Sequence, residues 1–224
     1  KNPMKLLPEN FLVDAAFHLL SARRCLSASH LNRMALTGLT KSEILEQTGA
    51  IRSLADWHLH WRQHAQDAME RTRSQIIDAV RRGDEFKRAS AAYYLASVFL
   101  PHGDPRVSEL EALSCAAFHG YGATCGKRFE KLELEIAGYE IHAFFQHPRT
   151  VEKTPAIILI PPLGSTKEHT DFMAAPFLDA GIACLSVDLP GVGESPGALP
   201  LDAQEILREV ISVLQRRPDV DGER

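Results

Sequence analysis

The chain has 224 residues, of which 45% are hydrophobic and 24% are charged, and its formal net charge is −4. This length and composition fit a globular protein of one large or two smaller domains. The mild negative balance, without a basic stripe, argues against a nucleic-acid partner, and no apolar run approaches the ~20 residues that cross a bilayer. Four scattered cysteines predict free thiols in a reducing compartment, so we expect a cytoplasmic protein.

The first half of the sequence has the periodicity of helices. The stretch PENFLVDAAFHLLSARR, residues 8–24, predicts an amphipathic helix with an apolar face made of Phe11, Ala15, Leu19 and Ala22. TKSE at residues 40–43 has the spacing of a capping box and predicts the start of another helix. A longer helix is expected from Ser53 to about Arg82, with Gly83 as its end. The apolar stripe of that helix consists of Trp57, Trp61, Ala65 and Ala68.

Two further helices are predicted before the pattern changes. DEFKRASAAYYLASVFLP and DPRVSELEALSCAAFHGYG each fit a helix, and the residues from Pro101 to Pro105 separate them. Because this half has no Val/Ile-rich alternation, we predict an all-helical, cap-like domain over residues 1–125.

One helical face in this half carries side chains of the metal-ligand type. His60, His64 and Asp67 are spaced i, i+4 and i+7 within WHLHWRQHAQD. Two histidines at this spacing can bind zinc, but a helical zinc site needs a further ligand and supporting groups around it. We therefore interpret this stripe as a solvated helix face and predict no metal site.

The pattern changes to that of strands at about Lys127. FEKLELEIAGYEIHAFFQHP alternates apolar and charged residues and predicts a β-hairpin with its turn at Ala137-Gly138. Residues 156–160 and the stretch IACLSVDLPG predict two buried strands of a parallel sheet. STKEHTDFMAAPFLDAG, with Ser165 and Glu168 in capping-box spacing, predicts a helix. DAQEILREVISVLQRR predicts an amphipathic helix with Ile206, Val210 and either Val213 or Leu214 facing inward. The order hairpin, strand, helix, strand, helix predicts an α/β domain over residues 126–224.

A serine motif lies in the loop after the second buried strand. Residues 193–197 spell G-x-S-x-G, the pattern of a nucleophile elbow. In an elbow, the residue after the serine donates its backbone N–H to the oxyanion, but Pro196 has no N–H. Pro200 also prevents a helix from starting at once, and the preceding strand ends too early, around Asp188. We therefore interpret Ser195 as a loop serine, and we expect Asp188 to accept backbone N–H bonds within the loop that follows it.

Two segments of the second half resemble the α/β-hydrolase superfamily. DLPGVGES is similar to the D-x-x-G-x-G-x-S loop of that family, and PPLGSTKEH is similar to the G-G-x-x-S-T-K-E segment of one branch. That branch includes 2,6-dihydroxypseudooxynicotine hydrolase, the polyketide-shortening hydrolases and the fermentation–respiration switch proteins. Its members carry a helical domain before the core, often with an ASxYY-like helix, and ASAAYY at residues 89–94 is comparable. The resemblance implies a helical domain followed by the first half of an α/β-hydrolase fold.

The resemblance also implies a serine hydrolase whose catalytic serine, acid and histidine lie beyond Arg224. This chain would supply the pocket roof and half of the oxyanion hole. The backbone N–H of Leu163 is the first candidate donor and that of Gly164 the second, although Pro161-Pro162 replaces the His-Gly or Gly-Gly of the family. We expect acyl transfer on an ester, amide or activated carbon–carbon bond of a small molecule, without a cofactor. The remainder of the hydrolase domain would come from the same or a second polypeptide.

Further residues are candidates for substrate contact. Tyr93 and Tyr94 can line the pocket roof, since tyrosine combines an apolar body with a hydroxyl group, and core packing is the alternative. His169 lies near the expected oxyanion turn and is the third candidate. Members of the resembled branch pair through the helical domain, which implies a homodimer.

Two other classes of protein stay open as alternatives. The first is a non-enzymatic helical interaction module with a degenerate α/β remnant. The second is a nucleotide-binding α/β protein, suggested by Gly191 and Gly193 after a strand. Pro196 and Pro200 disfavour the second class, because a phosphate-binding loop leads directly into a helix.

Overall fold

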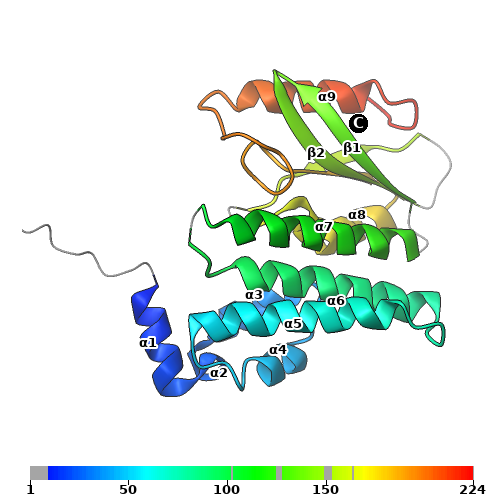
Figure 1. Ribbon diagram of the computed structural model, residues 1–224. Coiled ribbons are helices and arrows are strands. Elements are labelled where there is room, and N and C mark those ends of the chain that lie inside the picture. Colours follow the sequence, from blue (N-terminus) through cyan, green and yellow to red (C-terminus); the bar gives the residue numbers. More distant parts are fainter. Residues whose placement is uncertain (1–9, 102, 125–127, 149–152, 163, 224) are drawn as a thin grey trace, which may run out of the picture. The chain divides into compact units, whose positions relative to one another are not determined.

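The computed structural model describes residues 10–101, 103–124, 128–148, 153–162 and 164–223 (Figure 1). The chain divides into two compact units, Lys1–Ile77 with Asp84–Ala117, and Asp78–Gly83 with Phe118–Arg224. The division therefore falls inside a helix, whereas the sequence pattern places the domain boundary after residue 125.

The described part of the first unit, called here the helical unit, consists of helices and their connections, as predicted. The predicted stripe of Trp57, Trp61, Ala65 and Ala68 is almost completely buried and forms the centre of its core. The last two helices continue across the division into the second unit. The helices are α1 (Phe11–Leu20), α2 (Ala22–Cys25), α3 (Ala28–Leu36), α4 (Lys41–Gln47), α5 (Leu54–Thr72), α6 (Ala79–Ser97) and α7 (Pro105–Thr124).

The first predicted helix is divided in two, and its predicted apolar face is wrong. The chain turns at Ser21, where φ is 68° and ψ is 152°, and α2 starts after it. Phe17 is buried, while Phe11 and Leu19 are exposed. Phe17 orients the helix, because its ring packs against two aromatic rings of the core, with centroids 5.9 Å from Trp57 and 6.0 Å from Phe99.

The predicted helix from Ser53 to Arg82 is also wrong, because it is two helices. Asp78 caps the second, α6, and its Oδ1 accepts the backbone N–H of Arg81 at 2.8 Å. Gly83 lies inside α6 and does not end a helix. A Cβ atom at Gly83 would lie 3.1 Å from Oγ1 of Thr124, so a glycine there permits the close approach of α6 and α7.

The second unit contains a four-stranded sheet in the order β1-β2-β4-β3. The predicted hairpin is confirmed as β1 (Arg128–Ile136) and β2 (Tyr139–His147), and β2 also pairs antiparallel with β4 (Ala183–Val187). Its turn has positive φ at Ala137 (50°) and Gly138 (78°), as in a type I′ turn. The two predicted buried strands are confirmed as β3 (Ala156–Leu159) and β4, which are parallel.

Helices cover the two faces of this sheet (Figure 1). On one face, α9 (Gln204–Gln215) packs Ile206, Val210 and Leu214 against alternate residues of the strands, as its periodicity predicts. On the other face, the 3-10 helix η1 (Lys167–Thr170) leads into α8 (Asp171–Asp179), which packs near Leu159 and Cys184. The second unit is therefore a helix–sheet–helix arrangement, the layered architecture of an α/β fold.

The segment after α9 returns to the outer edge of β3. Thr154, just before β3, donates its backbone N–H to the carbonyl of Asp219 at 3.2 Å. The carbonyl of Thr154 accepts the backbone N–H of Asp221 at 2.8 Å, and Thr154 and Val220 form a parallel bridge. The chain thus runs parallel to β3 where it reaches Asp221.

No helix in the described ranges combines the length and hydropathy needed to span a membrane. Cys25 and Cys184 carry free thiols, while Cys125 lies outside the described residues.

Candidate functional site

The candidate site lies at the carboxyl end of β3 and β4. Because these strands are parallel, the segments that follow them meet at the same end of the sheet, which is where α/β proteins bind ligands. After β3, Ser165 donates its backbone N–H to the carbonyl of Pro162 at 3.0 Å, and Gly164 has a φ of 78° and is exposed. The first predicted oxyanion donor, Leu163, lies outside the described residues. We call the described residues of this segment, 161–162 and 164–166, the β3 turn.

The β3 turn ends at a helix cap that differs from the prediction. Thr166, and not Ser165, is the residue before η1, and its backbone N–H donates to Nδ1 of His169 at 3.1 Å. Because Nδ1 accepts this hydrogen, the proton of the neutral imidazole is on Nε2. Burial lowers the pKa of His169 to about 4, so the ring is neutral at neutral pH.

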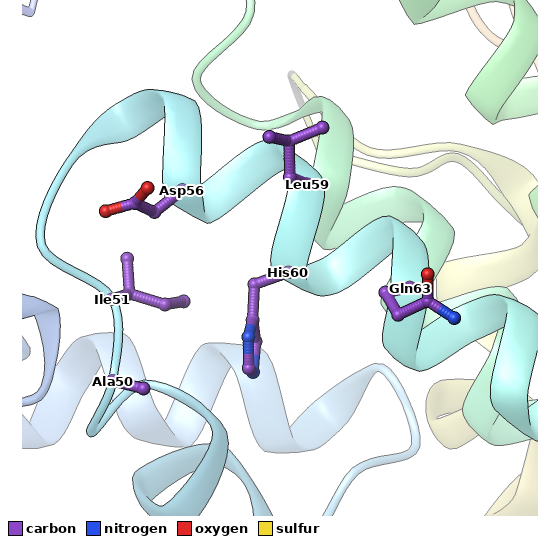
Figure 2. A pocket seen from close by; sticks show the side chains of 6 residues that line it. All are labelled: Ala50, Ile51, Asp56, Leu59, His60 and Gln63. Atoms are coloured by element: carbon purple, nitrogen blue, oxygen red, sulfur yellow. The ribbon is translucent and has the colours of Figure 1, made fainter.

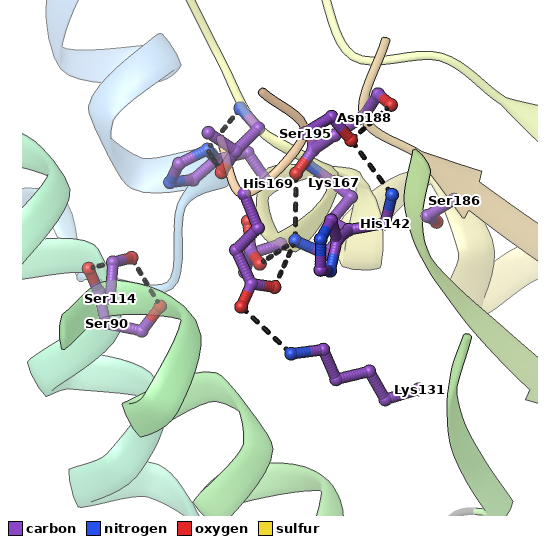
Figure 3. Close-up of polar contacts among 12 residues, drawn as sticks. Ser90, Ser114, Lys131, His142, Lys167, His169, Ser186, Asp188 and Ser195 are labelled. Atoms are coloured by element: carbon purple, nitrogen blue, oxygen red, sulfur yellow. Dashed lines mark hydrogen bonds and ion pairs between the residues drawn. The ribbon is translucent and has the colours of Figure 1, made fainter. Parts of the chain in front are cut away.

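Lys167 is the centre of a buried group of charges (Figure 3). Its side chain is 0% exposed, and its Nζ lies 2.8 Å from Oδ2 of Asp188 and 2.8 Å from Oε2 of Glu194. The same Nζ lies 2.9 Å from Oε1 of Glu168, and Lys131 of β1 reaches the other oxygen of Glu194 at 2.9 Å. We call these five residues, Lys131, Lys167, Glu168, Asp188 and Glu194, the strand-end cluster.

Asp188 connects the two segments at the end of the sheet. Its Oδ1 accepts the backbone N–H of Lys167 at 2.7 Å, while its Oδ2 binds the Lys167 ammonium group. The expected backbone N–H bonds from the following loop to this carboxylate are not found among the described residues, and the carboxylate binds Lys167 instead. That loop nevertheless packs against the carboxylate, because a Cβ atom at Gly193 would lie 2.3 Å from Oδ2, which only glycine avoids.

Burial and neighbouring charges shift the pKa values in the strand-end cluster. Burial raises the pKa of Asp188 to about 6, against the effect of Lys167. Burial is the largest influence on the pKa of Glu168 and acts to raise it, but Lys167, the hydrogen bond with Thr166 and His169 together lower the net pKa below the usual value. Three carboxylates face two ammonium groups, so the cluster carries an excess negative charge that favours a proton on Asp188.

Ser195 holds the loop after β4 in place. It is 2% exposed, and its Oγ donates to the carbonyl of Asp188 at 2.8 Å and accepts the backbone N–H of His142 at 2.9 Å. These bonds agree with the interpretation of Ser195 as a loop serine. They join the end of β4 to β2 and so support Asp188 from its main chain.

The sheet face under η1 and α8 is partly polar. Thr170 donates its hydroxyl to Ser186 of β4 at 2.6 Å, and Gln146 of β2 donates to Asp171 at 3.0 Å. These buried polar residues were not singled out from the sequence. For Gln146 and Ser186, the sequence signal is a polar residue at an inward-facing position of an otherwise apolar strand.

The predicted substrate-contacting tyrosines belong to the helical unit. Tyr93 is 5% exposed in its core, where burial raises the pKa of the hydroxyl, and Tyr94 is half-buried against the same core. His169, in the second unit, is 8% exposed. Core packing accounts for the position of Tyr93, and contact of these residues with a substrate stays a prediction.

The expectation of a solvated face on α5 is wrong for His60 and His64, which are half-buried, while Asp67 is exposed as expected. Nε2 of His60 lies 2.9 Å from Oε1 of Gln47, and Nε2 of His64 lies 3.0 Å from Oε1 of Glu43, so both rings pack against α4 and its start. Asp67 instead accepts from Gln63. The three side chains have different partners and do not form a common ligand set. His60 also borders a shallow pocket of about 460 Å³ (Figure 2), whose other lining residues are Ala50, Ile51, Asp56, Leu59 and Gln63.

The comparisons with known proteins identify the family. The model of the FrsA-like esterases matches residues 32–224. The chain belongs to the FrsA-like esterase family. Membership agrees with the helical unit, the mixed sheet and the strand-end geometry, and it confirms the resemblance to the α/β-hydrolase branch.

Solved structures share the fold of this FrsA-like chain. The crystal structure of the 2,6-dihydroxy-pseudo-oxynicotine hydrolase has a TM-score of 0.71 and 20% identity over 84% of this chain and 54% of its own. AbyA5 has a TM-score of 0.61 and 21% identity over 87% of this chain and 53% of its own. The chain thus spans about half the length of these structures. A search among curated proteins gave no match.

Proposed function

We propose that this chain forms the N-terminal part of a serine-type α/β hydrolase that cleaves an ester, amide or activated carbon–carbon bond of a small organic molecule. The remainder of the hydrolase domain would come from the same or a second polypeptide. The observation that carries the proposal is the pairing of the segment at Val220 with the residue before β3, at the edge of the sheet that faces away from β4.

The edge of β3 that faces away from β4 presents backbone groups with which a further strand could pair. The carbonyl of Pro155 accepts the backbone N–H of Ala183 in β4, so alternate residues point their peptide groups toward β4. Thr154 points the other way, to Asp219 and Asp221, and Ala156 and Ile158 follow on that edge. A strand continuing from Asp221 would pair with them and end beside the β3 turn. Such a strand would also cover an apolar edge that is otherwise prone to aggregation.

The chemistry follows from this position. In an α/β hydrolase the nucleophilic serine follows such a strand, and its Oγ attacks the substrate carbonyl while its proton passes to a histidine. The leaving group takes that proton, and water then releases the acyl group. We assign the oxyanion contact to the backbone N–H of Leu163, or to that of Gly164 in the β3 turn.

The helical unit would select the substrate. Tyr93 and Tyr94 would line the roof of the pocket, and His169, neutral at neutral pH, would contact the substrate from η1. A homodimer formed through the helical unit is part of the same proposal. The reaction needs no metal or cofactor, because the oxyanion is stabilised by backbone N–H groups.

The test is hydrolysis of p-nitrophenyl acetate and butyrate by the full-length protein. We expect saturable hydrolysis that a fluorophosphonate abolishes, since a fluorophosphonate modifies an activated serine. Hydrolysis that persists after complete treatment would contradict a serine mechanism. A folded protein without hydrolysis or labelling would favour the non-enzymatic interaction module.

A further inference from the structure

We infer that Lys167 is a positioning residue: it fixes residues 164–166 of the β3 turn, and with them the candidate oxyanion donor Gly164, against the loop after β4. This inference rests on the proposed function. Lys167 follows Gly164 by three residues in the sequence, so we treat its effect on the turn as one of position.

Both polar ends of Lys167 bind the same carboxylate. The backbone N–H donates to Oδ1 of Asp188 at 2.7 Å and Nζ donates to Oδ2 at 2.8 Å. Two bonds to one rigid group fix both the place and the direction of the residue, as in other paired charge-assisted contacts. The η1 helix has only four residues, too few to fix its own start.

Other residues fix the loop after β4, which forms the opposite side of the contact between Lys167 and Asp188. Glu194 accepts from Lys167 Nζ at 2.8 Å and from Lys131 Nζ at 2.9 Å, so it ties the loop after β4 to β1. Asp188 is itself held through the Ser195 hydroxyl, which donates to its carbonyl. The ammonium group also lies 5.0 Å from the centre of the Phe144 ring, which closes the site on the sheet side.

A role in stability alone does not explain a lysine at this position. Well-packed apolar residues often replace a buried ion pair without loss of stability, but they do not reproduce its directional bonds. The two roles can therefore be separated. Neutralising the buried charges together should preserve folding and still release the turn.

The experiment uses the full-length protein with the triple substitution K167M/E168Q/D188N. It removes the ammonium group and the two carboxylates that lose their partner, and it leaves Glu194 paired with Lys131. The matched control is R88M, which removes an ion pair of the helical unit with the same 2.8 Å separation, from Nε of Arg88 to Oε1 of Glu43, outside the strand-end cluster. Hydrogen exchange followed by mass spectrometry reports the turn, and p-nitrophenyl ester kinetics report the site.

We expect the triple variant to exchange the amides of residues 160–169 at least about tenfold faster than wild type, with β2, β4 and α9 unchanged. We expect its kcat to fall by about 10- to 100-fold, the scale of a displaced oxyanion donor, with KM within about threefold. R88M should show neither effect. Unchanged exchange of the turn, or acceleration spread evenly over the sheet, would overturn the inference.

The outcomes separate this inference from the proposed function. If the wild type hydrolyses esters and the triple variant matches it in exchange and kcat, the positioning role fails and the proposed function stands. If the wild type has no activity but the turn exchanges faster in the variant, Lys167 positions the turn and the proposed function fails. If the triple variant does not fold, E194Q replaces it. Faster exchange confined to residues 160–169 and 188–195 then supports the inference, and unchanged exchange overturns it.

Discussion

Two groups of charged side chains in this protein differ chiefly in their exposure. In the helical unit, a network links α4, α5 and α6, with Nε of Arg88 2.8 Å from Oε1 of Glu43 and Nε of Arg71 2.9 Å from Oε2 of Glu85. The side chains of Arg88 and Arg71 are 28% and 47% exposed. In the strand-end cluster, the side chains of Lys167 and Asp188 are both 0% exposed.

The comparison shows that ion pairs of similar length have different roles when their exposure to water differs. Water already solvates the ions of the helical-unit network, so each pair adds little free energy. In the strand-end cluster Lys167 and Asp188 have no exposed side-chain surface, and the loss of one partner leaves a buried charge unpaired. The first network is expected to adjust helix contacts slightly, while the second sets the geometry of the segments at the end of the sheet.

The largest effect on stability is expected when the lysine of the strand-end cluster is removed and its carboxylate partners are kept. K167M leaves Asp188 and Glu168 without their ammonium partner, and we expect the free energy of unfolding to fall by about 3–5 kcal/mol. The triple substitution K167M/E168Q/D188N should lose less than K167M alone. Urea denaturation of the three proteins measures the difference, and an equal or greater loss in the triple variant would contradict this account of the cluster.

The next effect depends on pH and concerns His169. Its pKa is about 4 in the folded state, against 6.5 for an unperturbed histidine, so only the unfolded state takes up the proton between these values. The stability from neutral His169 is complete above pH 6.5 and is lost as pH falls toward 4, by about 3 kcal/mol in total.

The variant H169Q removes this titration while its amide oxygen can still accept the Thr166 N–H. When the pH falls from 7 to 4, we expect the unfolding free energy of the wild type to fall by about 3 kcal/mol more than that of H169Q. Urea denaturation at several pH values measures it. Parallel curves for the two proteins would show that His169 is not held neutral.

A smaller effect is expected at Ser195. S195A leaves the backbone N–H of His142 and the carbonyl of Asp188 without the hydroxyl that both bind, and we expect a loss of about 1–3 kcal/mol in unfolding free energy. Fluorophosphonate labelling of the folded variant should persist. A variant of unchanged stability that no longer labels would instead identify Ser195 as a nucleophile.

The smallest effect belongs to the exposed network. R88M removes the contacts of Arg88 with Glu43 and Glu85, and we expect a loss of less than about 1 kcal/mol, because these groups are partly exposed. The loss should shrink further in 1 M salt, which screens exposed pairs. Thermal denaturation with and without salt measures it. A loss as large as that of K167M would remove the contrast between the two groups.

The sequence predicts those parts of the fold that depend on local pattern. Alternation over residues 129–145 gives the hairpin, and the spacing of Ile206, Val210 and Leu214 gives the buried face of α9. The start of α6 also had a local signal, since Asp78 is a helix-capping residue, but the longer apolar periodicity of α5 obscured it. The break at Ser21 had none, because serine rarely adopts a φ of 68°.

The candidate site depends on contacts that the local pattern does not encode. The position of the β3 turn and the loop after β4 could be predicted, because both follow buried strands. The partners of Lys167 lie 21 and 27 residues away in the sequence, and only the packing of η1 on the sheet brings them together. The sequence therefore predicts where the site lies, but not which charges hold it.

The most direct test of the proposed function maps the fluorophosphonate adduct on the full-length protein. Proteolysis and mass spectrometry of the labelled protein identify the modified serine. The account predicts an adduct on a serine in a G-x-S-x-G motif that follows residue 224 or belongs to a second polypeptide, with Ser195 unmodified. An adduct on Ser195, or on any serine of the helical unit, would contradict it.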